Sequence, residues 1–104
     1  MTQLTLTCRH VDKTAALEAR VRESLERLVR INDRIARCRL TVAGPERPTE
    51  AGPFEVHIEL SVPGAQIHAD NLQAGGSPAA DLYGAVREAF DDAKRQLQSL
   101  RWDH

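Results

Sequence analysis

Two histidines in the sequence stand at positions where they could meet carboxylates. If the Pro-Gly dipeptide at 63–64 closes a two-residue hairpin, His57 lies opposite Asp70 and His68 lies opposite Glu59. An imidazole opposite a carboxylate could hold a metal ion or act as an acid–base pair. Because the spacing fixes no third ligand or nucleophile nearby, charge pairing on an exposed sheet is the favoured interpretation. A small enzyme that uses this face is the weaker alternative.

Cys8 and Cys38 are the only cysteines, and both fall at inward positions of predicted strands. Neighbouring strands could bring the two sulfurs within reach of a disulfide or of a thiolate metal pair. Two cysteines do not form a disulfide framework, however, and buried free thiols are the common case in a reducing cytosol. We therefore expect two free structural thiols.

Other catalytic arrangements are absent from the sequence, which contains no glycine-rich phosphate loop, no CxxC and no HExxH motif. His10 has no serine or cysteine partner at a recognisable spacing. Asp91 and Asp92 are adjacent on a predicted helix, so their side chains point about 100° apart and cannot form a carboxylate dyad. We expect no enzymatic activity, no metal, no cofactor and no small-molecule substrate.

Basic residues form the remaining chemical pattern. In the first predicted helix they recur at spacings of seven, three and four residues and form a ridge, at Arg20, Arg27, Arg30 and Arg34. Further bases lie near the end of the last helix, where they also complement the helix dipole: Lys94, Arg95 and Arg101. This pattern is typical of a polyanion-binding surface or of a solvated surface with i,i+4 ion pairs, and both interpretations stay open.

Charge is unevenly distributed along the chain, although the net charge is only −1. Residues 1–42 contain nine Lys/Arg and five Asp/Glu, whereas residues 43–104 contain five and ten. Because salt screens charges over about 8–10 Å, a partner responds to local charge and not to the total. The asymmetry is compatible with a polyanion-binding face and also with two unrelated solvated surfaces.

The elements that would position these residues follow from hydrophobic periodicity. A period of two predicts strands at about 4–8, 35–43, 54–62 and 65–71. A helical period predicts one helix from the preferred N-cap Thr14, with Asp12 second, to Asn32-Asp33, and another over about 79–101. Glycine and proline predict a mobile loop at about 44–53, a link at 74–76 and a helix start at Ser77-Pro78.

The order β-α-β-β-β-α predicts an α+β two-layer sandwich with a four-stranded mixed sheet. The first two strands should be parallel because a helix connects them, and the last three should form an antiparallel meander. Each strand has one apolar face, so both helices should pack on one face of the sheet. The helix-facing positions are Cys8, Ala36, Cys38, Val56, Ile58 and Leu60. The solvent-facing positions are Arg37, Arg39, His57, Glu59 and His68.

Length and composition predict a single cytoplasmic domain over residues 1–104. The chain has 104 residues, of which 41% are hydrophobic and 28% are charged, which is ordinary for a folded domain. No apolar run approaches the roughly 18–20 residues of a membrane span, and the N-terminus lacks the pattern of a secretion signal. We expect no association with membranes.

Three segments carry a family likeness: LTCRHVDKTAAL at 6–17, VPGAQIHA at 62–69, and DLYGAV at 81–86 followed by FD at 90–91 and RQL at 95–97. They resemble the opening, the third-to-fourth strand hairpin and the second-helix signature of the ribosome hibernation-promoting factor and ribosome-associated inhibitor family. The similarity runs in order over nearly the whole chain, with the same succession of elements.

The resemblance implies a protein that binds the small ribosomal subunit in the channel used by mRNA and tRNA and holds ribosomes idle under stress. Basic residues on the two helices would contact ribosomal RNA (rRNA) phosphates through charge neutralisation and shape, without base readout. Arg27, Arg30 and Arg95 are the matching bases, and Arg20 and Lys94 are neighbouring candidates.

Ser24 and Asp92 depart from the family pattern, because members often carry Arg or Lys there. Residues 81–104 contain five acids and four bases, and each lost phosphate contact should lower the affinity and its salt dependence. Since the chain ends at His104, without the C-terminal dimerisation domain of long members, we expect a short form that is a monomer or a weak homodimer. The alternative is a divergent member that has lost tight RNA binding and acts as a stress-regulatory protein-interaction module.

Overall fold

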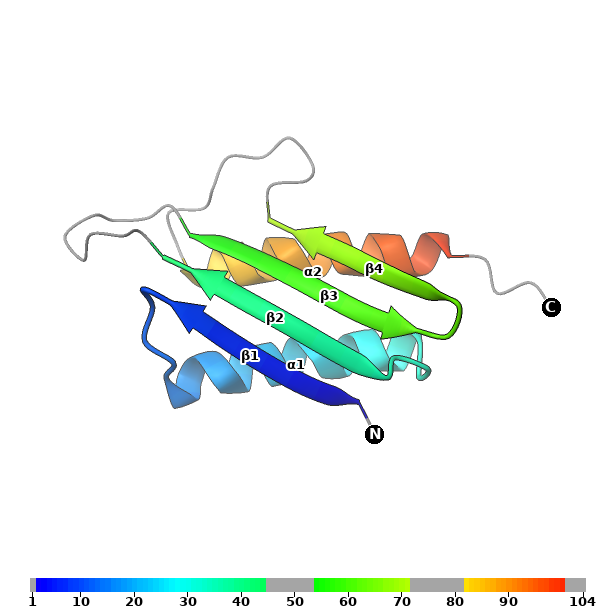
Figure 1. Ribbon diagram of the computed structural model, residues 1–104, viewed down its shortest axis with the longest axis horizontal. Helices are drawn as coiled ribbons and strands as arrows, with labels where there is room; N and C mark the ends of the chain where they lie inside the picture. The colour runs from blue at the N-terminus through cyan, green and yellow to red at the C-terminus, as the bar shows by residue number, and fades with distance from the viewer. Residues whose placement is uncertain (1, 45–53, 72–81, 101–104) are drawn as a thin grey trace.

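The computed structural model describes residues 2–44, 54–71 and 82–100 (Figure 1). The elements follow the predicted order, with these bounds: β1 Gln3–Arg9, α1 Ala15–Ile31, β2 Arg37–Ala43, β3 Glu55–Val62, β4 Ala65–Asp70 and α2 Leu82–Ser99. The expected loop beyond Gly44, the link at 74–76, the helix start at Ser77-Pro78 and Arg101 lie outside the described residues.

The four strands form one mixed sheet in the order β1-β2-β3-β4 (Figure 1). β1 pairs with β2 in parallel, and the remaining neighbours are antiparallel, as predicted. The register of the last hairpin is also confirmed, because His57 is paired with Asp70 and Glu59 with His68. The two-residue Pro-Gly turn fixes this register, and Gly64 adopts the positive φ of 78° that such a turn needs.

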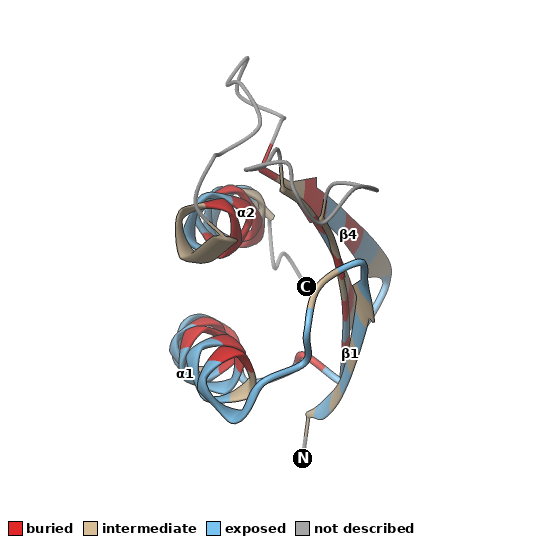
Figure 2. Cartoon of the chain, turned by 90° about the vertical axis from the view of Figure 1, so that its left-hand side faces the viewer, coloured by how far each residue is buried: buried red, intermediate tan, exposed pale blue. Residues whose placement is uncertain are grey.

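Both helices pack on the same face of the sheet (Figure 2). α1 contributes large aliphatic side chains at helical spacing, namely Leu17, Val21, Leu25 and Leu28, whereas α2 contributes the small residues Ala85, Ala89 and Ala93 with Val86, Phe90 and Leu97. Each fully buried aliphatic side chain stabilises the fold by about 1.5–3 kcal/mol. The α+β two-layer architecture is therefore the one that the sequence predicts.

At both ends of α1, a side-chain oxygen accepts a hydrogen bond from a nearby backbone N–H. Thr14 Oγ1 accepts a hydrogen bond from the backbone N–H of Leu17 at 3.1 Å, which confirms Thr14 as the N-cap. Asn32 ends the helix, and its Oδ1 accepts a hydrogen bond from the N–H of Arg34 at 2.9 Å.

Asn71 forms side-chain hydrogen bonds to the backbone after the end of β4. Its Oδ1 accepts from the N–H of Val56 at 3.0 Å, and its Nδ2 donates to the carbonyl of Phe54 at 2.8 Å.

The predicted inward position of Ala36 is wrong, because Ala36 is exposed and the preceding Ile35 fills the core. β2 begins only at Arg37, so the alternation of inward and outward side chains does not extend back to residue 36. The Ala36 N–H donates to the carbonyl of Ser61 and its carbonyl accepts from Gln3. Backbone pairing thus holds this turn while the larger Ile35 side chain takes the buried position.

Candidate nucleic-acid interface

α1 and α2 lie side by side and in the same direction (Figures 1 and 2). A groove lies between their side chains. Its volume is about 220 Å³, and each helix lines it at positions i, i+3, i+4 and i+7: Ser24, Arg27, Leu28 and Ile31 from α1, and Arg87, Phe90, Asp91 and Lys94 from α2. We call this surface the inter-helix groove. It combines three cationic side chains with one carboxylate, so its local charge is positive although the chain's net charge is negative.

The floor of the inter-helix groove is apolar and its rim is charged. Leu28 and Phe90 are buried, and Ser24 is only 8% exposed, whereas Arg27 and Lys94 are exposed. Long basic side chains can lie with their methylene stems along such a floor and their charges in solvent. A ligand that carries closely spaced negative charges therefore fits the rim better than an apolar ligand does.

Arg20 continues the basic row toward the start of both helices. It lies seven residues before Arg27 on α1, and its guanidinium carbon stands 5.2 Å from the centre of the Tyr83 ring on α2. A cation over an aromatic face is held by about 0.5–1 kcal/mol at an exposed site. This contact fixes the guanidinium at the helix–helix seam and leaves its charge exposed.

Two of the predicted site residues lie elsewhere. Arg30 faces the other side of α1, where it lines a second groove with Thr2 and Leu4. Arg95 pairs with Asp92 on its own helix, with 3.4 Å between Nη2 and Oδ1. The structure thus brings Arg20, Arg27 and Lys94 to one seam, and Arg30 and Arg95 do not join them there.

Arg87 also lines the groove, although it was not among the predicted binding residues. It stands seven residues before Lys94 on α2, the same spacing that separates Arg20 from Arg27 on α1. A search for bases at i and i+7 on the second helix would have found it. The family pattern instead indicated Arg95, which pairs with Asp92 and is not among the residues that line the groove.

Asp92 does not belong to the inter-helix groove. It is 8% exposed, and its Oδ2 accepts hydrogen bonds from the backbone N–H of Asp70 at 3.4 Å and from Gln96 Nε2 at 3.2 Å. Its carboxylate therefore joins α2 to β4. Of the two departures from the family pattern, Ser24 lines the groove and Asp92 does not.

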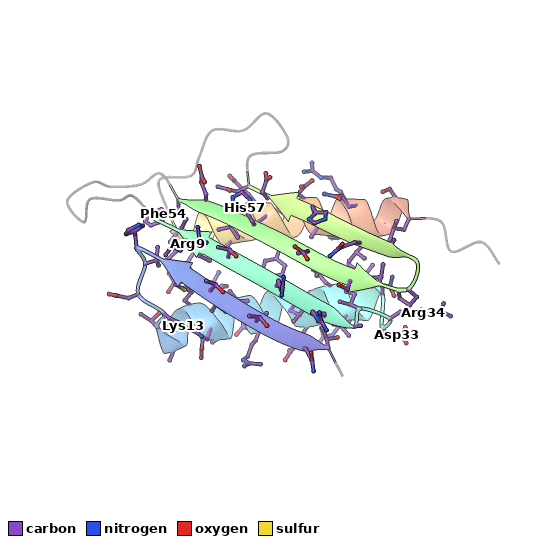
Figure 3. All side chains as sticks on the ribbon, in the orientation of Figure 1. Arg9, Lys13, Asp33, Arg34, Phe54 and His57 are labelled. Atoms are coloured by element: carbon purple, nitrogen blue, oxygen red, sulfur yellow. The ribbon has the colours of Figure 1, made fainter. Side chains whose placement is uncertain are left out.

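The histidine–carboxylate pairs lie on the open face of the sheet, which Figure 3 shows with His57 labelled. His57 stands 3.9 Å from Asp70 and 3.8 Å from Glu55, whereas Glu59 accepts a hydrogen bond from Gln66 at 2.7 Å. Within residues 2–44, 54–71 and 82–100, no group of three or more metal-binding side chains comes together. The contacts around His57 are thus those of one imidazole with two carboxylates.

The two cysteines are free, and the register separates them. Leu4, not Cys8, is level with Cys38, and Cys8 is level with Val42. Four residues along a strand span roughly 13 Å, so neither a disulfide nor a shared metal can join the two sulfurs. Burial raises the pKa of the Cys38 thiol to about 12, and burial also raises the pKa of Cys8.

In the part of the chain that the structure describes, neither helix is both long and apolar enough to cross a membrane.

Comparison with known families and curated proteins gives two matches. Residues 4–101 match the family model described as Sigma 54 modulation protein / S30EA ribosomal protein. A ribosome hibernation promotion factor from Deinococcus radiodurans is 31% identical over 96 residues, which cover 92% of this chain and 47% of that protein. The chain thus spans about half the length of this curated relative.

Solved structures also share the fold. The N-terminal domain of Protein Y from Thermus thermophilus superposes with a TM-score of 0.76 at 25% identity and covers 97% of this chain and 100% of that one. A ribosomal subunit interface protein from Coxiella burnetii gives a TM-score of 0.73 at 20% identity, with 94% of each chain covered. The second likeness concerns the fold alone.

Proposed function

The chain belongs to the Sigma 54 modulation protein / S30EA ribosomal protein family, and from this premise we propose that it is a cytoplasmic ribosome-associated regulator of translation. We place its contact with rRNA in the inter-helix groove. The protein would occupy the mRNA and tRNA channel of the small subunit, so that a bound ribosome stays idle.

The observation that carries this proposal is the gathering of bases from both helices at one seam. Arg27 comes from α1, whereas Arg87 and Lys94 come from α2, and all three line one groove. Positions seven residues apart on a helix are separated by roughly 10.5 Å along its axis, so the seam offers positive charge at several points along its length. An RNA backbone is the common cellular polyanion that presents phosphates at successive positions.

Binding through this groove would depend on the phosphate backbone. Each neutralised phosphate releases counterions and contributes about 0.7–0.9 to the slope of log K against log salt. Arginine would hold phosphate oxygens through two N–H groups, whereas lysine would act as a point charge. Among the described residues that line the groove, none has an amide side chain for reading bases, so we expect recognition by shape and charge.

Asp91 favours the second candidate function. Its carboxylate lines the same groove as the three bases, and Ile31 at the edge is 41% exposed. A partner protein with mixed charges and an apolar side chain would also fit such a surface. The second candidate is therefore a protein-interaction module for stress regulation that has lost tight RNA binding.

Pelleting with purified small ribosomal subunits tests the proposal. We expect the protein to enter the ribosomal pellet at about 50 mM salt and to be released at about 200 mM, with an affinity roughly 20–40-fold lower for three phosphate contacts. A ribosome-free sample gives the background. A pellet fraction equal to that background at both salt concentrations would contradict ribosome binding and favour the second candidate.

A further inference from the structure

The two edges of the sheet differ in how their backbone is covered. At the β4 edge, Gln96 Nε2 of α2 donates to the carbonyl of His68 at 2.7 Å, and Asp92 accepts from the N–H of Asp70. Side chains of α2 thus satisfy outward backbone groups of this edge strand. Covering an edge in this way prevents another chain from adding a strand there.

At the β1 edge, outward backbone groups remain open. Gln3 donates its N–H to Ala36, and the carbonyl of Arg9 accepts from Gly44, so the odd-numbered residues of β1 bond to β2. The alternation of a strand then directs the N–H and C=O of Leu4, Leu6 and Cys8 away from the sheet. Within the described ranges, no segment pairs with this side of β1.

β1 also lacks the features that usually protect an edge strand. Its seven residues, QLTLTCR, include no proline and no lysine, and they pair continuously with β2 without a bulge. Leu4, Leu6 and Cys8 are only half-buried, so their apolar side chains are partly open at this edge. A strand added here would pair with open backbone and cover apolar surface.

α1 presents a stripe of alternating charge beside the same edge. The stripe consists of residues four apart, namely Glu18, Arg22, Glu26 and Arg30. The last three line a groove of about 480 Å³ with the apolar side chains of Leu4, Leu25 and Val29. Glu18 pairs with Lys13 at 3.7 Å, and in the described part of the chain Arg22, Glu26 and Arg30 form no ion pair.

This stripe complements itself. When two copies run antiparallel, Arg22 of each copy faces Glu26 of the other, and Glu18 faces Arg30. A two-fold axis requires this kind of self-complementary surface. The axis then passes level with residue 24 along α1. Leu4 of β1 lines the same groove as Glu26 of α1, so the axis meets β1 near Thr5.

We infer that the partner of this edge is a second copy of the chain. Two β1 strands would pair antiparallel about Thr5, with Leu4 opposite Leu6, and would extend the sheet from four strands to eight. The outward groups of the even-numbered residues would form the hydrogen-bonded pairs. The inter-helix groove lies on the far side of α1 and stays open in this dimer, so the inference does not depend on the proposed function.

Sedimentation velocity of the full chain tests the dimer with a charge exchange. The wild type should dimerise as its concentration is raised to about 1 mM, which covers a dimer Kd at the weak end of the affinity range. Arg22→Glu and Glu26→Arg each place like charges opposite one another and should weaken self-association by about tenfold or more. An equimolar mixture of these two variants restores opposite charges and should form a heterodimer. Glu23→Arg, an exposed change on the same helix, is the control.

Hydrogen exchange gives a second readout of the same interface. The amides of Leu4, Leu6 and Cys8 should become protected as the concentration rises, whereas those of the odd-numbered residues are protected at all concentrations. A wild type that stays monomeric, or single variants that dimerise as well as the Glu23→Arg control, would overturn the inference. Pelleting with small subunits at dilute concentration is measured separately, so failure of ribosome binding would not be mistaken for failure of the dimer.

Discussion

Gln96 of α2 donates a hydrogen bond from Nε2 to the backbone carbonyl of His68 on β4, at 2.7 Å. The same Nε2 lies 3.2 Å from Asp92 Oδ2, which also accepts from the N–H of Asp70. Two adjacent turns of α2 are thereby joined to one strand. Because Arg87, Phe90 and Lys94 are on the same helix, this contact also sets where α2 presents its half of the inter-helix groove.

Asp92→Ala should lower the free energy of unfolding by about 1–3 kcal/mol, because it leaves partly buried donors without their acceptor. Asp92→Asn retains one acceptor oxygen and should cost less. Urea denaturation measures both, with the exposed Gln98→Ala as the matched control on α2. If Asp92→Ala lowered the free energy of unfolding by no more than the control does, the carboxylate would not be holding α2 against β4.

Gly44→Ala should also destabilise the fold. A Cβ at this position would lie 2.7 Å from the carbonyl oxygen of His10 and 2.7 Å from Val11 Cγ2, where the chain leaves β1 beside the end of β2. Relieving this contact requires the backbone to shift, which costs about 1–3 kcal/mol. Thermal unfolding measures the change, and a midpoint equal to that of the wild type would refute the close approach.

His10→Gly should act in the opposite direction. His10 has a φ of 58°, in the left-handed region where a side chain is strained. Glycine removes this strain but increases the entropy of the unfolded chain, so we expect a net gain of about 0.5–1 kcal/mol. The same thermal measurement decides between a gain and a loss, with His68→Gly in a regular strand as a control that should lose stability.

The Cys38 thiol should make stability fall at alkaline pH. Its pKa is raised by burial from 9.0 to about 12, so above pH 9 the unfolded chain loses this proton while the folded chain keeps it. The free energy of unfolding then falls by up to about 1.4 kcal/mol per pH unit, until the thiol of the folded chain ionises as well. Comparison with Cys38→Ala isolates this effect, and parallel pH curves for the two proteins would contradict it. At pH 8, iodoacetamide should modify Cys8 before Cys38.

Asp91→Asn should strengthen binding to the small subunit. The carboxylate lines the groove with Arg27, Arg87 and Lys94 and repels the phosphates that we place there. We expect an affinity about 3–10-fold higher at low salt, with a smaller difference at high salt because the repulsion is screened. Glu88→Gln, an exposed change on the same helix, is the control. Equal or weaker binding by Asp91→Asn would argue against phosphates in the groove.

Local patterns in the sequence predict most of the fold. The Pro-Gly turn sets the pairing of His57 with Asp70, and the Thr14 hydroxyl sets the start of α1, because each depends on residues close by in the chain. Ala36 was assigned to the wrong face because an alternating pattern does not show where the alternation starts. Ile35 takes the buried position there as a member of the hydrophobic core.

The candidate site depends on such distant contacts and was less predictable. Arg27 was predicted from helical spacing and Lys94 from its place near the end of the second helix, but which side of each helix meets the other follows from packing on the sheet. Arg30 and Arg95 were selected with them, but Arg30 lines a different groove and Arg95 pairs with Asp92. Asp92 is similar, because the sequence does not show the contact with β4 that buries this carboxylate.

The most direct test of the account is a comparison of two triple variants with the same change in net charge. One removes the groove bases through Arg27→Gln, Arg87→Gln and Lys94→Gln, and the other removes bases of the open sheet face through Arg9→Gln, Arg37→Gln and Arg39→Gln. The groove variant should bind small subunits at least about tenfold more weakly, with a shallower salt dependence, and the sheet variant should bind like the wild type. Equal losses in both variants, or a larger loss in the sheet variant, would contradict the groove as the rRNA-binding surface.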